Sequence, residues 1–193
     1  IRKSINDSVG MGASYTNTGM LYYNQGNVNK AINYYFNALK LFEPIGDKRG
    51  MANVYNNLGV LFDDQSDYKK ALEYYNKSYD AFNDIENKDG MAVAINNIGF
   101  IYKKQKNYNK AVEHFESALK IQTEIGNEQD AAYTYNNLGQ SWKLKGDLDK
   151  ANEYYNKSIS IHQKIGNKKG LSLAYQNMAK LLIDQEKFNE SFD

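Results

Sequence analysis

Asparagine recurs at a fixed interval in this chain of 193 residues, and its side-chain amides have the chemistry to bind a peptide main chain. A doubled asparagine occurs in the segments YNNLG, INNIG and YNNLG, each forty residues after the last. An amide offers both a hydrogen-bond donor and an acceptor, so a row of amides can pair with the N–H and C=O groups of an extended peptide, whatever its side chains. The second position of the pair is asparagine in five successive copies: Asn17, Asn57, Asn97, Asn137 and Asn177. The first position is always polar and uncharged: Thr16, Asn56, Asn96, Asn136 and Gln176.

The five residues at the second position are called the second-asparagine column, and the five at the first position the first-asparagine column. Both columns also allow a purely structural interpretation. Asparagine is roughly 0.5–0.7 kcal/mol worse than alanine inside a helix, so its recurrence calls for a compensating role. The amides could grip a ligand, or they could tie each repeat to its neighbour by hydrogen bonds. The two roles are compatible, and the second-asparagine column is the stronger candidate for a binding site because it does not vary.

The asparagines belong to a repeat of forty residues that occupies nearly the whole chain. Residues separated by multiples of forty are called equivalent below. A small residue follows the asparagine pair by two positions: Gly19, Gly59, Gly99, Gly139 and Ala179. A second small residue comes twelve positions later: Ala31, Ala71, Ala111, Ala151 and Ser191. An aromatic residue comes sixteen positions later: Tyr35, Tyr75, Phe115 and Tyr155.

Each repeat is predicted to form two helices, over residues 50–65 and 68–86 in the second copy, because apolar residues recur there at helical spacing. Asp67 is a predicted N-cap of the second helix, with Asn27, Asn107 and Asp147 at the equivalent positions. Gly26 and Gly146 are predicted stops of the first helix. The second helix is predicted to end at glycines that can adopt a left-handed conformation: Gly46, Gly126 and Gly166. The close approach of the two helices is expected where Gly59 faces Ala71.

The register predicts one helical solenoid over residues 1–193 that is a fragment of a longer protein. Its predicted parts are the end of a preceding repeat (1–7), repeats one to four (8–47, 48–87, 88–127 and 128–167) and a partial fifth repeat (168–193). Solenoids normally end in polar caps, and neither end of this chain has one. The helix expected near 171–185 would therefore expose Leu181 and Leu182 unless something covers them.

The pattern of small, alanine and aromatic residues resembles the tetratricopeptide repeat, and the forty-residue period resembles its longer-helix subclass. That subclass includes the LGN/Pins spindle-orientation proteins, kinesin light chains, and many bacterial sensor kinases and regulators. The resemblance implies an all-α fold, a right-handed superhelix of tandem helix–turn–helix units. It also implies that asparagines in the concave groove hold the main chain of a ligand.

Helical geometry places both asparagines of each pair on the side opposite the packing residues, which is the concave side of such a superhelix. Apolar and basic residues share the middle of the predicted groove: Val93, Phe100, Lys103, Lys104, Tyr133 and Lys143. They favour a peptide segment that carries an apolar anchor beside acidic residues. The alternative for each lysine is a solvated helix surface. Asp63 and Asp64 would disfavour an acidic ligand near the second repeat.

The composition argues against several other classes of function. The net charge is +1, unlike the basic excess of a nucleic-acid binder, and the seventeen tyrosines fall mostly in predicted core columns. There is no cysteine, and neither His114 nor His162 stands in a group with metal-ligand spacing. The chain has no glycine-rich phosphate loop and no catalytic set, and its apolar runs are too short to span a bilayer. We expect no cofactor and no membrane contact of this segment.

The sequence therefore predicts a protein-interaction module that binds a peptide segment, as the sensory or regulatory part of a larger signalling protein. The alternative is a structural scaffold that self-assembles through its uncapped ends or packs on an effector domain of its own chain. This segment is not expected to be an enzyme, although an enzymatic domain such as a histidine kinase could lie outside it. A cytoplasmic location is expected, the alternative being the periplasmic sensor part of a membrane-anchored kinase.

Overall fold

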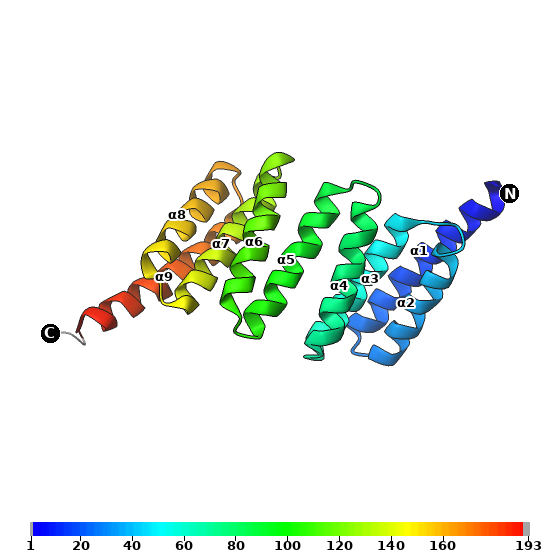
Figure 1. The fold of residues 1–193 in the computed structure, drawn as a ribbon, viewed down its shortest axis with the longest axis horizontal. Coiled ribbons are helices and arrows are strands. Elements are labelled where there is room, and N and C mark those ends of the chain that lie inside the picture. Colours follow the sequence, from blue (N-terminus) through cyan, green and yellow to red (C-terminus); the bar gives the residue numbers. More distant parts are fainter. Residues whose placement is uncertain (1, 191–193) are drawn as a thin grey trace. The chain divides into compact units, whose positions relative to one another are not determined.

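The computed structural model describes the backbone of residues 2–190 and the side chains of residues 7–186. Within that part, the secondary structure consists of nine α-helices and no strands (Figure 1). The first helices of the repeats are α1 (Arg2–Asn24), α3 (Lys48–Asp64), α5 (Lys88–Lys104), α7 (Glu128–Lys145) and α9 (Lys168–Glu190). The second helices are α2 (Val28–Phe42), α4 (Tyr68–Asn83), α6 (Tyr108–Glu124) and α8 (Leu148–Lys164). The predicted all-α fold of tandem helical hairpins is confirmed.

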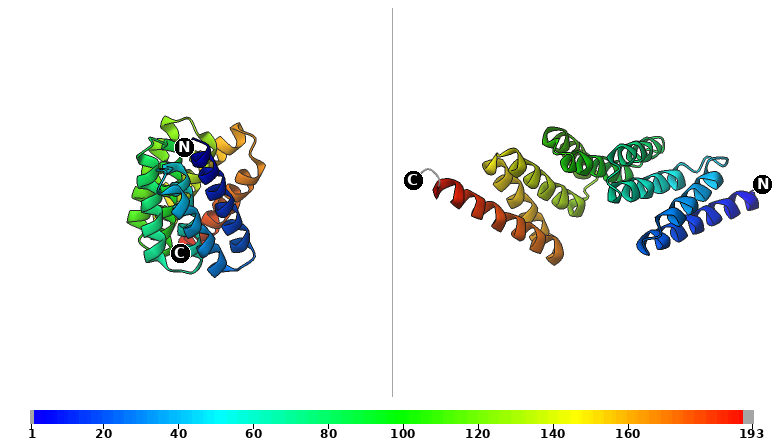
Figure 2. Two further views of the ribbon diagram at one scale, coloured as in Figure 1. Left: turned by 90° about the vertical axis from the view of Figure 1, so that its right-hand side faces the viewer. Right: turned by 90° about the horizontal axis from the view of Figure 1, so that it is seen from below.

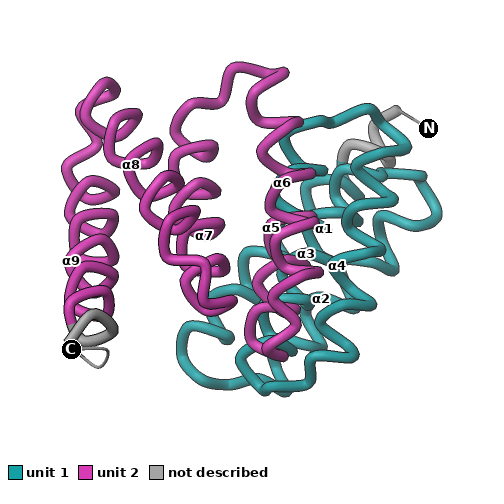
Figure 3. Tube along the Cα trace, turned by 60° about the vertical axis from the view of Figure 1, so that its left-hand side comes forward, with its two compact units in different colours: residues 1–94 teal, residues 95–193 magenta. Residues whose placement is uncertain are grey.

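The helices group into two compact units, divided between residues 94 and 95 within α5 (Figure 3). In the first unit, α1 packs on α2 and α3 on α4, and α2 and α3 join the two hairpins. In the second unit, α7 packs on α8, with α6 and α9 on the two sides of this hairpin. Figures 1 and 2 show the paired helices lying side by side within each unit.

The second helices begin at the predicted residues. The side chains of Asn27, Asp67, Asn107 and Asp147 each accept a hydrogen bond from the backbone N–H three residues later, at 3.0–3.4 Å. Such N-caps satisfy a donor that has no partner within the helix, and each contributes about 1 kcal/mol to stability. The first helices use the same device, because Asp47, Asn87, Asn127 and Asn167 cap α3, α5, α7 and α9.

The turns between helices require a left-handed residue, and the five predicted glycines adopt this conformation with φ between 67° and 89°. Three equivalent positions hold other residues in the same conformation: Ser66 and Lys106 with φ of 60°, and Glu86 with φ of 52°. A residue with a Cβ atom is strained there by roughly 1 kcal/mol. The repeat therefore keeps its turn geometry even where the glycine is absent.

Glu86→Gly is accordingly expected to stabilise the chain by about 1 kcal/mol, because glycine relieves the strain that the Cβ atom causes. Thermal unfolding followed by circular dichroism would measure the change. Gly126→Ala, the opposite change at an equivalent turn, serves as the control and should destabilise by a similar amount. A Glu86→Gly variant less stable than the natural chain would contradict this account of the turn.

The core of each repeat depends on an aromatic ring that packs on a glycine. A Cβ atom added at Gly59 would lie 2.5 Å from the Tyr75 ring, and one at Gly139 would lie 2.6 Å from the Tyr155 ring. Both rings are buried, with exposures of 2% and 1%. The ring four positions after Ala71 therefore makes the nearest contact with the glycine. The close approach predicted at the alanine column is seen in the first repeat, where a Cβ atom added at Gly19 would lie 3.3 Å from the backbone carbonyl oxygen of Ala31.

The structure differs from the sequence interpretation at both ends. Helix α1 runs unbroken from Arg2 across the repeat boundary predicted between residues 7 and 8, and Asn6 stands where the equivalent turn has Gly46. Helix α9 continues to Glu190, because Lys187 replaces the aspartate or asparagine N-cap that begins the other second helices. Leu181, which was expected to be exposed, is buried in a cluster with Tyr155, whereas Leu182 is 49% exposed.

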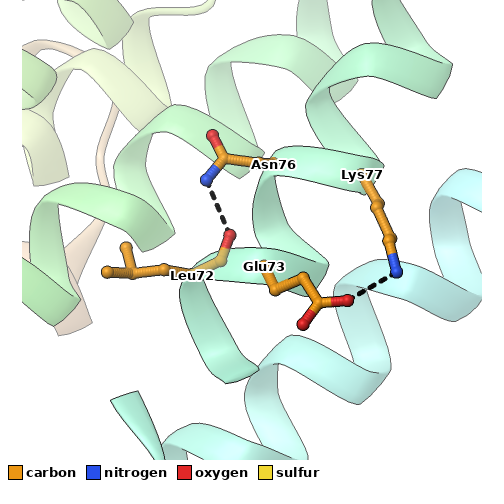
Figure 4. A network of polar contacts seen from close by, with 4 residues as sticks. All are labelled: Leu72, Glu73, Asn76 and Lys77. Atoms are coloured by element: carbon orange, nitrogen blue, oxygen red, sulfur yellow. Dashed lines mark hydrogen bonds and ion pairs between the residues drawn. The ribbon is translucent and has the colours of Figure 1, made fainter. Parts of the chain in front are cut away.

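The outer surface of the second helices carries short-range polar contacts that do not depend on a partner. On α4, Lys77 Nζ lies 2.6 Å from Glu73, and Asn76 donates a 2.7 Å hydrogen bond to the carbonyl of Leu72 (Figure 4). An exposed pair of this kind contributes only about 0.3–0.5 kcal/mol. Asn76 is thus an exposed asparagine outside the two asparagine columns, and it provides a control for the experiments below.

Candidate functional site

The candidate site is the side of the first helices that carries the two asparagine columns, named here the asparagine face. Its position follows from the hairpin packing, because Leu58 and Gly59 are buried against the second helix while Asn56 and Asn57, next to them in sequence, are only half-buried. Each compact unit has its own asparagine face, and the two are described separately.

In the first unit, the second-asparagine column is accessible. Asn17 on α1 is exposed, and Asn57 on α3 is half-buried. The first-asparagine residue of α1, Thr16, instead bonds the carbonyl of Gly12 in its own helix at 2.9 Å. A row of amides is therefore presented on this unit by the second column, with Asn56 contributing from the first.

An aromatic–acidic contact joins α1 and α3 on the same face. The Tyr23 hydroxyl donates a hydrogen bond to the carboxylate of Asp64. This bond, together with burial and the negative charge, raises the pKa of Tyr23 to about 12. The contact satisfies part of the negative charge of Asp64, which the sequence analysis expected to disfavour acidic ligands here.

In the second unit, the first-asparagine column connects neighbouring first helices. Asn96 Nδ2 donates to Thr134 Oγ1 at 2.8 Å, and Asn177 Nδ2 donates to Asn136 Oδ1 at 3.0 Å. Asn136 and Asn137 are buried, with exposures of 3% and 8%. The structural role that the sequence left open, tying repeats together, is thus present in this unit.

The amides of the second unit still include accessible groups. Asn97 and Asn177 of the second-asparagine column are half-buried. These two side chains are thus partly exposed, although Asn177 Nδ2 bonds Asn136, whereas Asn137 is nearly closed to solvent.

The basic residues predicted for the middle of the face are engaged within the second unit. Lys103 donates to Gln140 Oε1 at 2.9 Å, and its ammonium lies 4.5 Å from the centre of the Phe100 ring. Burial, with a smaller effect of the Lys104 charge, lowers the pKa of Lys103 to about 8. Lys103 is therefore still mostly protonated at pH 7, but its ammonium is engaged within the unit, whereas Lys104 is exposed.

The other predicted residues lie in separate surroundings. Lys143 Nζ pairs with Asp184 at 2.7 Å and also donates to the carbonyl of Lys180 at 3.3 Å. Phe100 packs edge-on against the buried Phe115, with ring centres 5.4 Å apart. Tyr133 lies instead at the other end of the hairpin, against His162. The structure brings together Phe100 and Lys103 but does not unite the predicted residues in one cluster.

A hollow in the first unit was missed by the sequence analysis. It has a volume of about 330 Å³ and lies where α3 meets the first turns of α5. Its polar lining includes Arg49, Asn53, Asn56 and Asn87. The signal was available in the sequence, because Asn53 is small and polar where its equivalent two repeats later is Tyr133.

Other kinds of site find no support in the described part of the chain. Residues 7–186 contain no group of three or more histidine, cysteine, aspartate or glutamate side chains placed to hold a metal ion. Among the described helices, none combines the length and apolar character needed to cross a bilayer.

Comparison with known proteins agrees with this architecture. The family model described as "Tetratricopeptide repeat" matches residues 10–84 and 90–164. No curated protein sequence is significantly similar to the chain.

Several solved structures share the fold. BtubC (BKLC) from P. vanneervenii is 25% identical, with a TM-score of 0.73 over 80% of this chain and 64% of that protein. The apo form of RapI is 17% identical, with a TM-score of 0.82 over 94% of this chain and 66% of that one. Aspartyl phosphate phosphatase F from Bacillus subtilis is 21% identical, with a TM-score of 0.86 over 96% of this chain and 49% of that one.

The chain thus spans less than two thirds of the length of these structural relatives. The family is established by the matched repeats, which cover both compact units, and by helical hairpins that recur every forty residues. This chain belongs to the tetratricopeptide repeat family, whose repeats support a module for interaction with proteins.

Proposed function

We propose that the chain binds an extended peptide segment of a partner protein along its asparagine face and serves as the regulatory part of a signalling protein. The observation that carries the proposal is the second-asparagine column, which is unbroken in five repeats and is exposed or half-buried at Asn17, Asn57, Asn97 and Asn177. Amides at these positions supply donors and acceptors that match a peptide main chain in any sequence.

Support for the signalling role comes from the structural relatives. One of them is an aspartyl phosphate phosphatase, and a further structure with this fold, from Pyrococcus horikoshii, is a signal transduction ATPase with a tetratricopeptide repeat sensor. These proteins are 21% and 20% identical to the chain, so they share its fold, and the signalling role remains our proposal.

We propose different roles for the two asparagine columns. In the second unit the first-asparagine column holds neighbouring helices together, as the bonds of Asn96 and Asn136 show. The second column takes part in this tie through Asn177, which donates to Asn136, and we assign the grip on a ligand to this column. We therefore assign Asn17, Asn57, Asn97 and Asn177 to peptide binding, with a lesser role for Asn137 because it is buried.

The test is the double variant Asn17→Ala with Asn57→Ala, both on the asparagine face of the first unit, measured against peptides selected from a random displayed library. The variant is expected to bind these peptides at least ten-fold more weakly, because it loses two hydrogen bonds of about 1 kcal/mol each. Fluorescence anisotropy with labelled peptides gives the dissociation constants, and circular dichroism reports the helix content, which should not change.

Asn76→Ala is the matched control, since this exposed asparagine on α4 bonds only its own helix. It should bind the selected peptides as the natural chain does. Equal binding by the double variant would exclude the amides as the grip. Loss of helix content in the double variant would show that the second column is structural as well.

A structural scaffold remains the second candidate, and the contacts of Asn96 and Asn177 favour it in part. A scaffold that self-assembles would change its mass with concentration in static light scattering. The peptide-binding proposal expects a constant mass.

A further inference from the structure

The hollow in the first unit contains chemistry that the asparagine column does not explain. Its apolar lining includes Phe82, Gly90 and Val93, and its polar lining includes Asn53 and Asn87. Its volume of about 330 Å³ lies at the lower end of the range for ligand pockets, so it suits one side chain and not a whole cofactor.

A capping asparagine, a glycine and a ring line the hollow, and this set of three is called the frame. The second unit contains the same frame eighty residues later. Asn87 and Asn167 each accept a hydrogen bond from the N–H of a glycine three residues on, both at 2.9 Å. A Cβ atom at either glycine would lie 2.3–2.4 Å from the ring beneath it, Phe82 in the first unit and His162 in the second. The glycine, the ring and the capping asparagine are therefore arranged alike in the two units.

The two frames differ in the residue that covers them. In the second unit, Tyr133 lies edge-on against the His162 ring with centres 4.8 Å apart, and its hydroxyl accepts a 3.2 Å hydrogen bond from Asn167 Nδ2. In the first unit the equivalent residue is Asn53, whose side chain is too short to reach this place. Among the residues that the structure describes, Asn87 Nδ2 and the Asn53 amide have no hydrogen-bond partner.

We propose that the hollow of the first unit binds the phenol side chain of a tyrosine carried by a partner peptide, in the place that Tyr133 fills in the second unit. The ring would pack on the edge or face of Phe82 and beside Val93, and the hydroxyl would accept a hydrogen bond from Asn87 Nδ2. Tyrosine is favoured over an aliphatic side chain for two reasons. Its ring can form an aromatic pair with Phe82, and its hydroxyl can accept a hydrogen bond from Asn87 Nδ2.

This inference rests on the proposed function for how the peptide reaches the hollow, since Asn56 lines the hollow and stands beside Asn57 of the second-asparagine column. The fit of the phenol in the hollow depends on the frame of Phe82, Asn87 and Gly90, and not on the second-asparagine column. The rim carries Arg49 and Asp89, which have opposite charges, so a neutral phenol is a better match than a charged side chain.

The experiment is a titration of the whole chain with N-acetyl-L-tyrosinamide, observed by NMR at the backbone amide of Gly90 and the methyl groups of Val93. Saturable shifts are expected with a dissociation constant on the order of 1 mM, as befits a single side chain. N-acetyl-L-phenylalaninamide should bind about five-fold more weakly, because it lacks the hydroxyl that Asn87 would bond.

Two variants decide the outcome. Asn53→Tyr reproduces the second unit, so it should fill the hollow, abolish the shifts with both probes and raise the melting temperature. Asn87→Asp keeps the N-cap, as Asp47 does for α3 with a 2.9 Å bond to Gly50, but removes the donor. It should therefore remove the advantage of the tyrosine probe over the phenylalanine probe, and it decides the question if Asn53→Tyr fails to fold.

The inference is overturned if the natural chain shows no saturable shifts at Gly90 and Val93, or if Asn53→Tyr and Asn87→Asp respond as the natural chain does. Asn17→Ala, on the remote helix α1, separates this result from the proposed function. It should weaken an extended peptide without affecting the tyrosine probe, so either claim can fail while the other stands.

Discussion

Phe115→Ala is expected to lower the free energy of unfolding by about 3–5 kcal/mol. The Phe115 ring on α6 is completely buried, and it packs with Ala111, Val112 and Leu138 and against Phe100. It also covers Gly99, where an added Cβ atom would lie 2.8 Å from the ring. Because the glycine leaves no side chain that could move into the space, truncation would leave a cavity between α5 and α6.

Denaturant unfolding followed by circular dichroism would measure the loss. Phe36→Ala is the matched control, since Phe36 lies on the equivalent type of helix but is 40% exposed. Its removal should cost less than about 1 kcal/mol. Equal losses for the two variants would show that the aromatic columns do not form the core as described.

His162→Phe is expected to stabilise the chain, and more so in acid. His162 has an exposure of 1%, and neither ring nitrogen has a hydrogen-bond partner in the described part of the chain. Burial therefore lowers the pKa of its imidazole below the ordinary value of 6.5. The equivalent residues Phe42 and Phe82 pack on Gly50 and Gly90 as His162 packs on Gly170, so phenylalanine fits the same frame.

The lowered pKa fixes the sign of the pH dependence. The unfolded chain binds a proton at His162 more readily than the folded chain does, so stability rises with pH in this range. The contribution of the neutral histidine is complete above about pH 6.5 and is lost as the pH falls toward the folded pKa. His162→Phe should gain about 1–2 kcal/mol at pH 7, from removal of unpaired buried polar atoms, and more at pH 5.

Melting temperatures measured between pH 5 and pH 8 would test this, with Phe82→His as the converse control. That change places a histidine in the matching frame of the first unit and should make stability more sensitive to acid. A His162→Phe variant with the pH dependence of the natural chain would contradict the assignment.

The fold was largely predictable from the sequence because its signals are local and repeated. The N-caps at Asn27 and Asp67 and the left-handed glycines at Gly46 and Gly126 were identified correctly, since each depends on backbone geometry within one turn. The ends were predicted less well. Repeat register alone suggested a break near residue 187, but without an N-cap residue there α9 continues to Glu190.

The sequence predicted which side of the first helices carries the candidate site, but not the contacts within the site. Helical geometry placed the asparagines opposite the core, but it could not show which of them bond each other across repeats. Asn136 and Asn177 meet because of the spacing between α7 and α9, which no single helix encodes. The hollow required the same information, since it forms only where Asn53 of α3, Phe82 of α4 and Asn87, the residue before α5, meet.

The central claim, that the second-asparagine column grips a peptide main chain, is tested most directly at the amides themselves. The side-chain NH₂ resonances of Asn17, Asn57, Asn97 and Asn177 should shift in a saturable way when a selected peptide is added, while that of Asn76 stays in place. N-methylation of the peptide backbone at the bound residues should weaken binding ten-fold or more, since each methyl group removes a donor. Unshifted asparagine resonances together with undiminished binding of the N-methylated peptide would contradict the account.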